Sequence, residues 1–189
     1  PAAIVAADFN EDGWQDLAGT NRSQHYFAFL NPQGGAWGAP AATDSRRGNG
    51  TDIVAAHLGA DRALDLVTVT DAGQVAIAKG EVDGAGNPTG TWGTVARFSS
   101  TSATVGLLND VEVAELTGDG LPDVLTVDNQ YGQLAIWPGN PVLPGYVVSD
   151  PIIVPVEDPS GAPLSPIEAF VDDWTADGRP DALVATSEG

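Results

Sequence analysis

The first feature of this sequence that could do chemistry is the acidic segment from Asp8 to Asp16. Oxygen-bearing side chains stand at its first, third, fifth and ninth positions, and Gly13 stands at the sixth. Together with the backbone carbonyl at the seventh position, these oxygens can fold inward around one hard cation. Calcium accepts about 6–8 oxygen ligands at about 2.3–2.6 Å and tolerates irregular geometry, whereas magnesium needs a tight octahedron and transition metals favour His or Cys. The segment therefore indicates a calcium-binding loop.

The acidic segment occurs four times without gaps. Its final residue recurs as Asp16, Asp65, Asp123 and Asp181, and the last two intervals are equal. Such self-similarity, at a nearly fixed period of about 50–60 residues, is typical of repeat architectures. An Asp- and Gly-rich hairpin turn, held only by side-chain to backbone hydrogen bonds, is the alternative for each copy. Four copies in register favour a shared site.

The second copy, from His57 to Asp65, departs from the pattern. His57, Gly59 and Arg62 stand where the first copy has Asp, Asn and Gly, so that only Asp61 and Asp65 keep their carboxylates. Arg62 can supply a fixed positive charge in place of a metal ion. We therefore expect the second loop to bind no metal.

Short strand-like runs surround the acidic segments. Apolar and β-branched residues follow all four, and an apolar-Ala-apolar triplet begins at a nearly constant distance after the final Asp of the first three. The triplets are Phe27-Ala28-Phe29, Val75-Ala76-Ile77 and Leu134-Ala135-Ile136. A unit of about 50 residues with several short strands and a Gly- and Pro-rich connection is typical of a β-propeller blade. The expected fold class is all-β, with β-propeller blades of four antiparallel strands and about three and a half blades in this chain.

Two helical calcium loops begin with the same residues, but the rest of the unit does not fit them. An EF-hand needs Glu at position 12 and a helix on either side. Here position 12 of the first segment is Gly19, inside a strand-like run. A dockerin loop likewise enters a helix, whereas β-forming residues follow every copy here. The β-hairpin form of the loop is therefore favoured.

These features resemble the FG-GAP/VCBS repeat family. The resemblance rests on the four acidic loops, the strands that follow them and the closing segment Trp37-Gly38-Ala39-Pro40, and it covers nearly the whole chain. Repeats of this family occur in the β-propeller of integrin α-subunits, in fungal seven-bladed lectins and in large secreted bacterial proteins. The resemblance implies structural calcium ions and a secreted or cell-surface location, although family membership says little about the ligand.

The resemblance also implies a ligand set for three of the loops. In each, four side chains and one backbone carbonyl would surround Ca²⁺, so two to three structural calcium ions are expected. The ligands of the first loop are Asp8, Asn10, Asp12, the Trp14 carbonyl and Asp16. Those of the third loop are Glu115, Thr117, Asp119, the Leu121 carbonyl and Asp123. Those of the fourth loop are Asp173, Thr175, Asp177, the Arg179 carbonyl and Asp181.

The repeats divide the chain at about residues 1–49, 50–107, 108–165 and 166–189, and the last is incomplete. About three and a half blades do not close a propeller, because known propellers have about 4–8, and open strand edges are prone to aggregation. The remaining blades are therefore expected from a longer parent chain, from a second copy that gives a seven-bladed homodimer, or from another subunit. The start at Pro1, without Met or a signal peptide, favours a piece of a longer chain.

The composition excludes several other classes. The 189 residues carry 26 acidic and 7 basic side chains, for a net charge of -19, and contain no Cys. So negative a surface would repel the phosphates of nucleic acids. A chain without Cys forms no disulfide scaffold and has no thiol nucleophile. No apolar run approaches the roughly 18 residues of a membrane-spanning helix.

The expected function is a non-enzymatic, calcium-binding extracellular scaffold that presents loops to a protein or glycan partner. A carbohydrate-binding lectin is the first alternative, because aromatic rings can stack on sugars and the chain has 5 Trp. Of these, Trp14 and Trp174 are expected to be exposed, and Trp37 and Trp92 to fill space between blades. The non-catalytic part of a secreted polysaccharide-degrading enzyme is less favoured. No Gly-x-Ser-x-Gly or His-Glu-x-x-His motif supports catalysis by this chain.

Overall fold

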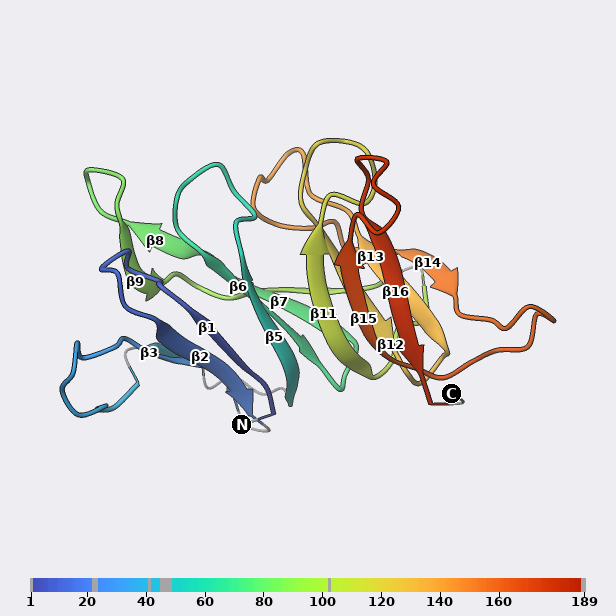
Figure 1. Ribbon diagram of the computed structural model, residues 1–189, viewed down its shortest axis with the longest axis horizontal. Coiled ribbons are helices and arrows are strands. Elements are labelled where there is room, and N and C mark those ends of the chain that lie inside the picture. The colour runs from blue at the N-terminus through green and yellow to red at the C-terminus, as the bar shows by residue number, and fades with distance from the viewer. Residues whose placement is uncertain (1, 22–23, 41, 45–48, 102, 188–189) are drawn as a thin grey trace.

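The computed structural model describes residues 2–21, 24–40, 42–44, 49–101 and 103–187. In these residues all regular secondary structure is β-strand, as the strand-like runs predict, and no helix is long and apolar enough to cross a membrane. Figure 1 shows the strands in chain order. They are β1 (Ile4–Ala7), β2 (Asp16–Asn21), β3 (Gln24–Phe29), β4 (Ala42–Asp44), β5 (Gly50–Ala56), β6 (Asp65–Thr70), β7 (Gln74–Ala78), β8 (Gly80–Val82), β9 (Pro88–Trp92), β10 (Ala96–Ser99), β11 (Leu108–Ala114), β12 (Asp123–Asp128), β13 (Gln133–Trp137), β14 (Ile152–Pro155), β15 (Pro166–Asp172) and β16 (Asp181–Thr186).

The strands form small antiparallel sheets that follow one another along the chain. The first sheet has the order β1-β2-β3-β4, the second β5-β6-β7-β10 and the third β11-β12-β13-β14. β15 and β16 form a two-stranded sheet, and β8 and β9 form a separate hairpin inserted between β7 and β10. The first and third sheets are therefore simple meanders of consecutive strands, and the second is a meander with one hairpin inserted before its last strand.

The second strand of the two middle sheets carries the strongest β-forming sequence. β6 reads Asp-Leu-Val-Thr-Val-Thr and β12 reads Asp-Val-Leu-Thr-Val-Asp, and every residue of both strands is buried. A strand that is covered on both faces is expected to be apolar or β-branched throughout, because neither face meets water. Both strands have a neighbouring sheet on each face.

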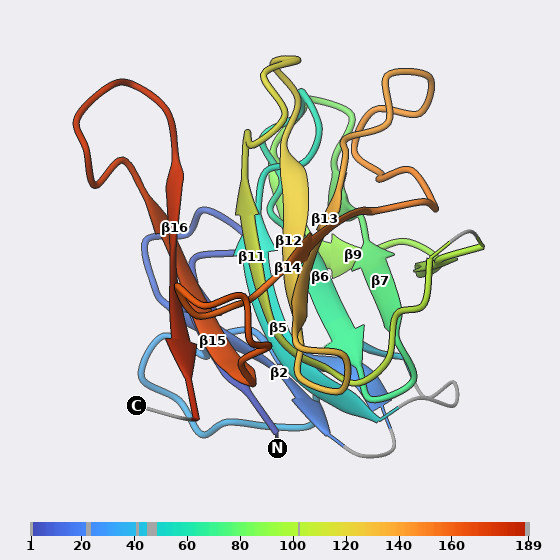
Figure 2. The ribbon, with the colours of Figure 1, turned by 90° about the vertical axis from the view of Figure 1, so that its right-hand side faces the viewer.

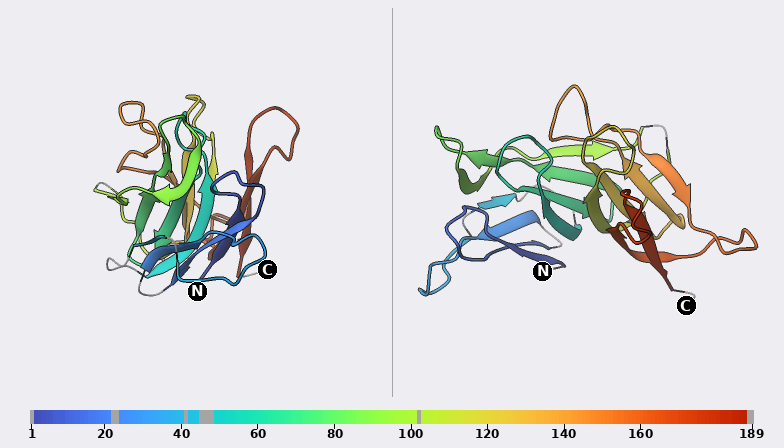
Figure 3. Two further views of the ribbon diagram at one scale, coloured as in Figure 1. Left: turned by 90° about the vertical axis from the view of Figure 1, so that its left-hand side faces the viewer. Right: turned by 45° about the horizontal axis from the view of Figure 1, so that its top comes forward.

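Apolar side chains fill the spaces between successive sheets. Between the second and third sheets, Val67 and Val69 pack with Leu108, Val111 and Trp137. Separate apolar clusters join the first sheet to the second and the third sheet to β15 and β16. The first strands of successive sheets, β1, β5, β11 and β15, are neighbours, and the array is seen from other sides in Figure 2 and Figure 3.

The two Trp residues expected between blades have different surroundings. Trp92 lies in β9 and is buried, with its ring centroid 5.0 Å from that of Phe9 and 6.0 Å from that of Tyr26. Trp37 follows β3 outside any strand, touches Phe29 edge-on and is exposed. The expectation is therefore wrong for Trp37. The hairpin β8–β9, inserted between β7 and β10, carries Trp92 onto the first sheet, whereas Trp37 touches Phe29 of its own sheet and no further sheet of the described residues covers it.

The four acidic segments occupy equivalent places. They connect β1 to β2, β5 to β6, β11 to β12 and β15 to β16, and Figure 1 shows them at the upper ends of these strands. In each, the final Asp pairs with the last residue of the preceding strand. The pairs are Ala7 with Asp16, Ala56 with Asp65, Ala114 with Asp123 and Asp172 with Asp181. The final Asp therefore begins a strand at the base of each hairpin loop.

Candidate metal-binding loops

The final Asp of the third acidic segment holds its hairpin together through the main chain. Asp123 is fully buried, and its Oδ2 accepts a hydrogen bond from the N–H of Leu116 at 2.7 Å. Its Oδ1 accepts another from the N–H of Gly139, beyond the third strand, at 2.8 Å. One carboxylate thus joins the loop, the second strand and the end of the third strand, and we call this arrangement the aspartate clasp.

The same clasp occurs in the first two sheets, where the final Asp is again fully buried. The N–H donors are Phe9 (2.9 Å) and Asn31 (2.6 Å) for Asp16, and Leu58 (3.0 Å) and Gly80 (2.8 Å) for Asp65. Asp181, in the two-stranded sheet, accepts from the N–H of Thr175 at 3.0 Å. The clasp is present even in the second loop, which lacks the oxygen side chains of the first and third positions. The recurrence of the final Asp therefore has a structural cause that does not require a metal.

The carboxylates of the first loop lie close enough to influence one another. Burial raises the pKa of Asp16, hydrogen bonds from backbone N–H groups lower it in part, and the negative charges of Asp12 and Asp8 raise it further. The pKa of Asp12 is lowered, chiefly by a hydrogen bond from Gln33, whose Nε2 lies 3.0 Å from its Oδ2. A cation bound among Asp8, Asp12 and Asp16 would relieve their mutual repulsion.

In the first and fourth loops, the side chains at the first and fifth positions fold over the loop in the same way. The two oxygens of Asp8 accept from the N–H groups of Asp12 and Gly13 at 3.0 and 2.8 Å. Oδ1 of Asp12 accepts from the N–H of Trp14 at 2.9 Å. The matching bonds of the fourth loop run from Asp177 (3.0 Å) and Gly178 (2.8 Å) to Asp173, and from Arg179 (2.9 Å) to Asp177. Two loops that are far apart in sequence thus share one hydrogen-bonded form.

The third loop reaches a similar form with a longer side chain. Oε1 of Glu115, at the first position, accepts from the N–H of Asp119 at 3.1 Å. Oδ1 of Asp119 in turn accepts from the N–H of Leu121 at 2.8 Å. Thr117, at the third position, donates from Oγ1 to Oδ1 of Asp123 at 3.4 Å, so its hydroxyl lies beside the clasp.

The backbone of these three loops takes one unusual path. Residues at the fourth and sixth positions have φ between 54° and 88°, and they are Glu11 and Gly13, Gly118 and Gly120, and Ala176 and Gly178. A left-handed φ costs a residue other than Gly about 1 kcal/mol, and it persists only where the surroundings enforce it. In the second loop, whose residues are all described, neither Ala60 nor Arg62 has such a φ. The three loops with a predicted ligand set therefore share a path that the second loop does not take.

The second loop receives its positive charge from Lys79. Nζ of Lys79 lies 2.7 Å from Oδ2 of Asp65 and 4.0 Å from Oδ2 of Asp61. Arg62 instead pairs with Glu11 of the first loop. The expectation for Arg62 is therefore wrong, because its side chain bridges two neighbouring loops and leaves the remaining carboxylates of its own loop to Lys79.

The structure keeps the predicted ligands within their loops but does not gather them into a finished metal site. Among the described residues, no group of three or more His, Cys, Asp or Glu side chains has such an arrangement. The carboxylates of the first and fourth loops are turned to N–H groups of their own loops. A carboxylate so bonded keeps further lone pairs for a cation. The three ligand sets, including the carbonyls of Trp14, Leu121 and Arg179, remain predictions.

A second set of carboxylates, which the motifs did not indicate, lies on the first strands of the sheets. Asp52 in β5 and Asp110 in β11 accept hydrogen bonds from the N–H groups of Val111 at 3.1 Å and Ala169 at 2.8 Å. Burial, together with the neighbouring Asp52 carboxyl, raises the pKa of Asp110 to about 6. Burial also raises the pKa of Asp52. Asp52 and Asp110 are separated by as many residues as Asp65 and Asp123, the final residues of the second and third acidic segments. This shared spacing is the signal in the sequence that could have identified them.

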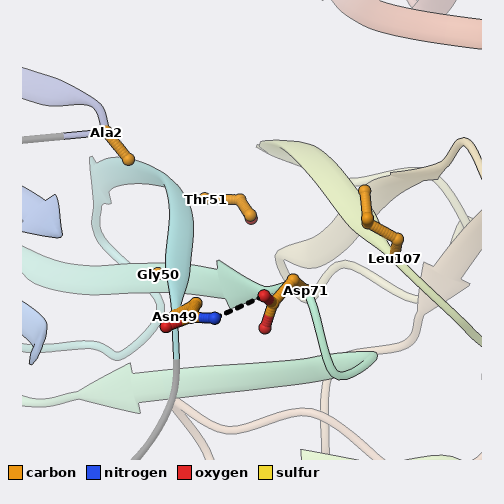
Figure 4. Close-up of a pocket in the computed structure, with 6 residues that line it drawn as sticks. All are labelled: Ala2, Asn49, Gly50, Thr51, Asp71 and Leu107. Atoms are coloured by element: carbon orange, nitrogen blue, oxygen red, sulfur yellow. Dashed lines mark hydrogen bonds between the residues drawn. The ribbon is translucent and has the colours of Figure 1, made fainter. Parts of the chain in front are cut away.

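In the described part of the chain, hollows lie at opposite ends of the strands. One, of about 570 Å³, lies between the third and fourth loops, and Glu115, Thr117 and Arg179 are among the residues that line it. The other, of about 490 Å³, lies where β5 and β11 begin and is shown in Figure 4. There Asn49 donates from Nδ2 to Oδ2 of Asp71 at 2.6 Å. The first hollow is bounded by predicted metal ligands and is therefore the one nearest to the candidate sites.

Neither models of known protein families nor curated proteins give a match to this chain. The resemblance to FG-GAP/VCBS repeats therefore depends on the motifs and spacing within this sequence alone.

Proposed function

We propose that this chain is a non-enzymatic, calcium-binding scaffold of β-propeller blades that works outside the cell and presents its loops to a protein or glycan partner. The observation that carries the calcium sites is the common form of the first, third and fourth loops. They share left-handed residues at the fourth and sixth positions, and their first-position carboxylates accept from the N–H of the fifth. The second loop, which lacks three of the expected residues, has no such path and holds Lys79 beside its carboxylates.

Calcium in these loops is structural in this proposal. It would offset the repulsion among the loop carboxylates and add its binding free energy to the stability of the folded state. Extracellular modules bind calcium at about 10⁻⁴–10⁻³ M, which matches its concentration outside cells. Loops on a rigid sheet scaffold can then keep one shape for a partner.

Exposed apolar residues at both ends of the array support further blades. Leu183 in β16 is 57% exposed, whereas Val67 and Leu125, at the same place in β6 and β12, are 0% and 1% exposed. At the other end, Leu17 is 36% exposed, whereas its equivalent Leu66 is 0% exposed. Another sheet on each face would bury these residues. That sheet would come from a longer parent chain, from a second copy that gives a seven-bladed ring, or from another subunit.

Carbohydrate binding is a second candidate function, because Trp14 in the first loop and Trp174 in the fourth are both exposed. An aromatic ring beside carboxylates and N–H groups can stack on a sugar ring while the polar groups bind its hydroxyls. A glycan array probed with the calcium-loaded protein tests this function. Glycan binding that is lost in Trp14→Ala or Trp174→Ala would support a lectin, and an array without binding would leave the scaffold.

Thermal unfolding of the metal-stripped protein, with and without added Ca²⁺, tests the calcium proposal. A ligand that binds only the folded state raises the melting temperature of the protein. Millimolar Ca²⁺ should therefore raise the melting temperature of this chain by several degrees. Removing the fifth-position carboxylates, with Asp12→Ala, Asp119→Ala and Asp177→Ala, should abolish the shift. The matched variant Asp61→Ala, in the second loop, should leave the shift in place. Equal melting temperatures with Ca²⁺ and with a chelator would overturn the calcium sites.

A further inference from the structure

The side chain of Lys79 reaches from the end of β7 into the acidic loop of the same sheet. Its Nζ lies 2.7 Å from Oδ2 of Asp65 and 4.0 Å from Oδ2 of Asp61. These residues stand at the ninth and fifth positions, and theirs are the carboxylates that this loop retains. Only 19% of the Lys79 side chain is exposed, and Asp65 is fully buried. The charge pair is therefore only partly screened by solvent.

Two glycines leave the space that the ammonium group occupies. A Cβ atom on Gly59 would lie 2.7 Å from Nζ of Lys79, and one on Gly145 would lie 2.5 Å from it. Gly59 stands at the third position, where the first loop has the predicted ligand Asn10. Gly145 lies between β13 and β14, so the third sheet encloses the ammonium group from the other side. The loss of a third-position ligand and the placement of Lys79 thus depend on the same space.

His57, at the first position of the loop, supplies a second internal donor. Its Nδ1 lies 3.1 Å from the carbonyl oxygen of Ala63, at the seventh position. A carbonyl oxygen only accepts, so Nδ1 carries the hydrogen. In the other loops this carbonyl is a predicted metal ligand. The oxygen groups that the second loop retains at the fifth, seventh and ninth positions therefore all face a donor from within the chain.

We propose that Lys79 is the built-in cation of the second loop and holds it closed in the way that calcium holds the other three. The second loop is then a latent calcium site, which the ammonium group of the chain itself fills. This inference rests on the proposed calcium sites of the first, third and fourth loops. It adds that removal of calcium loosens those three loops and leaves the second loop closed.

Native-state hydrogen exchange tests the inference, because amides that donate to the clasps report on each loop separately. In the unmodified chain, transfer from millimolar Ca²⁺ to a chelator should speed exchange of the Phe9 and Leu116 amides by about tenfold or more and leave the Leu58 amide unchanged. Lys79→Met should speed exchange at Leu58 in either condition. Arg62→Met is the matched control, since it removes a positive charge from the same loop but not from the clasp, and it should leave Leu58 unchanged.

The outcomes distinguish this inference from the proposed function. If the chelator changes no amide and Lys79→Met still speeds exchange at Leu58, the calcium sites fail and the role of Lys79 stands. If Lys79→Met leaves Leu58 unchanged, or the chelator speeds Leu58 as much as Phe9 in the unmodified chain, the inference is overturned.

Calorimetric counting of bound Ca²⁺ gives an independent readout of the latent site. The variant that combines His57→Asp, Arg62→Gly and Lys79→Ala restores two loop residues and removes the ammonium group. It should bind one more Ca²⁺ per chain than the variant with His57→Asp and Arg62→Gly alone, in which Lys79 still fills the site. Equal numbers of bound ions in the two variants would overturn the latent site.

Discussion

Oδ2 of Asp52 accepts a hydrogen bond from the backbone N–H of Val111 at 3.1 Å and so joins the first strands of the second and third sheets. One repeat later, Asp110 accepts from the N–H of Ala169 at 2.8 Å and joins the third sheet to β15. Glu168 stands at the next place in this series, one further repeat after Asp110. Partly buried carboxylates thus connect the sheets along their first strands, in addition to the apolar clusters between them.

This connection makes stability depend on pH. The pKa of Asp110 is raised from 3.8 to about 6 in the folded protein, so its protonated form is favoured there. The stabilisation that protonated Asp110 contributes to the folded state is complete below the usual pKa of Asp and is lost as the pH rises through about 6. We expect the free energy of unfolding to fall by about 1–2 kcal/mol from about pH 4 to about pH 7, after allowance for partial exposure. The pKa of Glu112, raised by burial and by the charges of Asp110 and Glu168, acts in the same direction.

Asp110→Asn should remove most of this pH dependence. An Asn amide can accept from Ala169 and donate to Asp52, so the variant should be more stable than the unmodified chain near neutral pH and about as stable in mild acid. Chemical denaturation at a series of pH values measures this difference. Glu157→Gln, at an exposed carboxyl, is the control and should change little. An unchanged pH profile in Asp110→Asn would rule out this site as the source.

The aspartate clasp should contribute strongly to stability without any metal. Asp123→Ala leaves the N–H groups of Leu116, Thr117 and Gly139 without their acceptor. Each unpaired buried group costs about 1–3 kcal/mol, so we expect a loss of about 3–5 kcal/mol in urea denaturation of the metal-free protein. Asp119→Ala, at an exposed position of the same loop, is the matched control. It should reduce the calcium response and leave the metal-free stability nearly unchanged, and equal losses in the two variants would contradict the clasp.

The left-handed residue at the sixth loop position should be sensitive to a Cβ atom even where there is space for one. Gly13 has a φ of 88°, and a Cβ there would meet nothing within 4 Å. Gly13→Ala should therefore destabilise the protein by about 1 kcal/mol through backbone strain alone and weaken calcium binding. Gly38 has equal space around it and no left-handed φ. If Gly38→Ala lowers the melting temperature as much as Gly13→Ala does, backbone strain in the loop is not the cause of the lost stability.

The exposed faces at the two ends of the array should drive association of this chain. Leu183→Glu places a charge on the exposed face of β16. The equivalent residues of the second and third sheets, Val67 and Leu125, are buried. We expect the average mass in analytical ultracentrifugation to rise with concentration for the unmodified chain and to stay near that of one chain for Leu183→Glu. Leu143→Glu is the control, because Leu143 is similarly exposed but lies outside the strands. If Leu143→Glu lowers the average mass as much as Leu183→Glu does, the added charge alone is responsible.

The strands and the hairpin position of each acidic segment could be predicted because their signals are local. Asp65 to Thr70 combines an acidic loop end with an apolar, β-branched run, and the structure makes it β6. The hairpin β8–β9 was not predicted, because the Gly- and Trp-rich segment around Trp92 has the composition of a connection. In the structure this segment pairs with β8, and its Trp92 packs on Phe9 of the first loop and Tyr26 of the first sheet.

The contacts that matter most at the candidate sites could not be predicted from the motifs. Lys79 lies 14 residues from Asp65, and Val111 lies 59 residues from Asp52. The pairing of whole strands and the stacking of whole sheets decide these partners. Arg62 was the nearest basic residue in the sequence, but its backbone position directs it to Glu11 in the neighbouring loop. Spacing in sequence therefore located the loops, whereas the sheets determine which charges meet inside them.

Anomalous scattering at long wavelength, from a crystal grown in millimolar Ca²⁺, tests the central claim most directly because it locates each calcium ion. We predict anomalous peaks beside Asp16, Asp123 and Asp181, and none in the second loop, where Nζ of Lys79 lies against Asp65. Empty first, third and fourth loops at saturating Ca²⁺ would contradict the calcium sites, and a peak between Asp61 and Asp65 would contradict the role of Lys79.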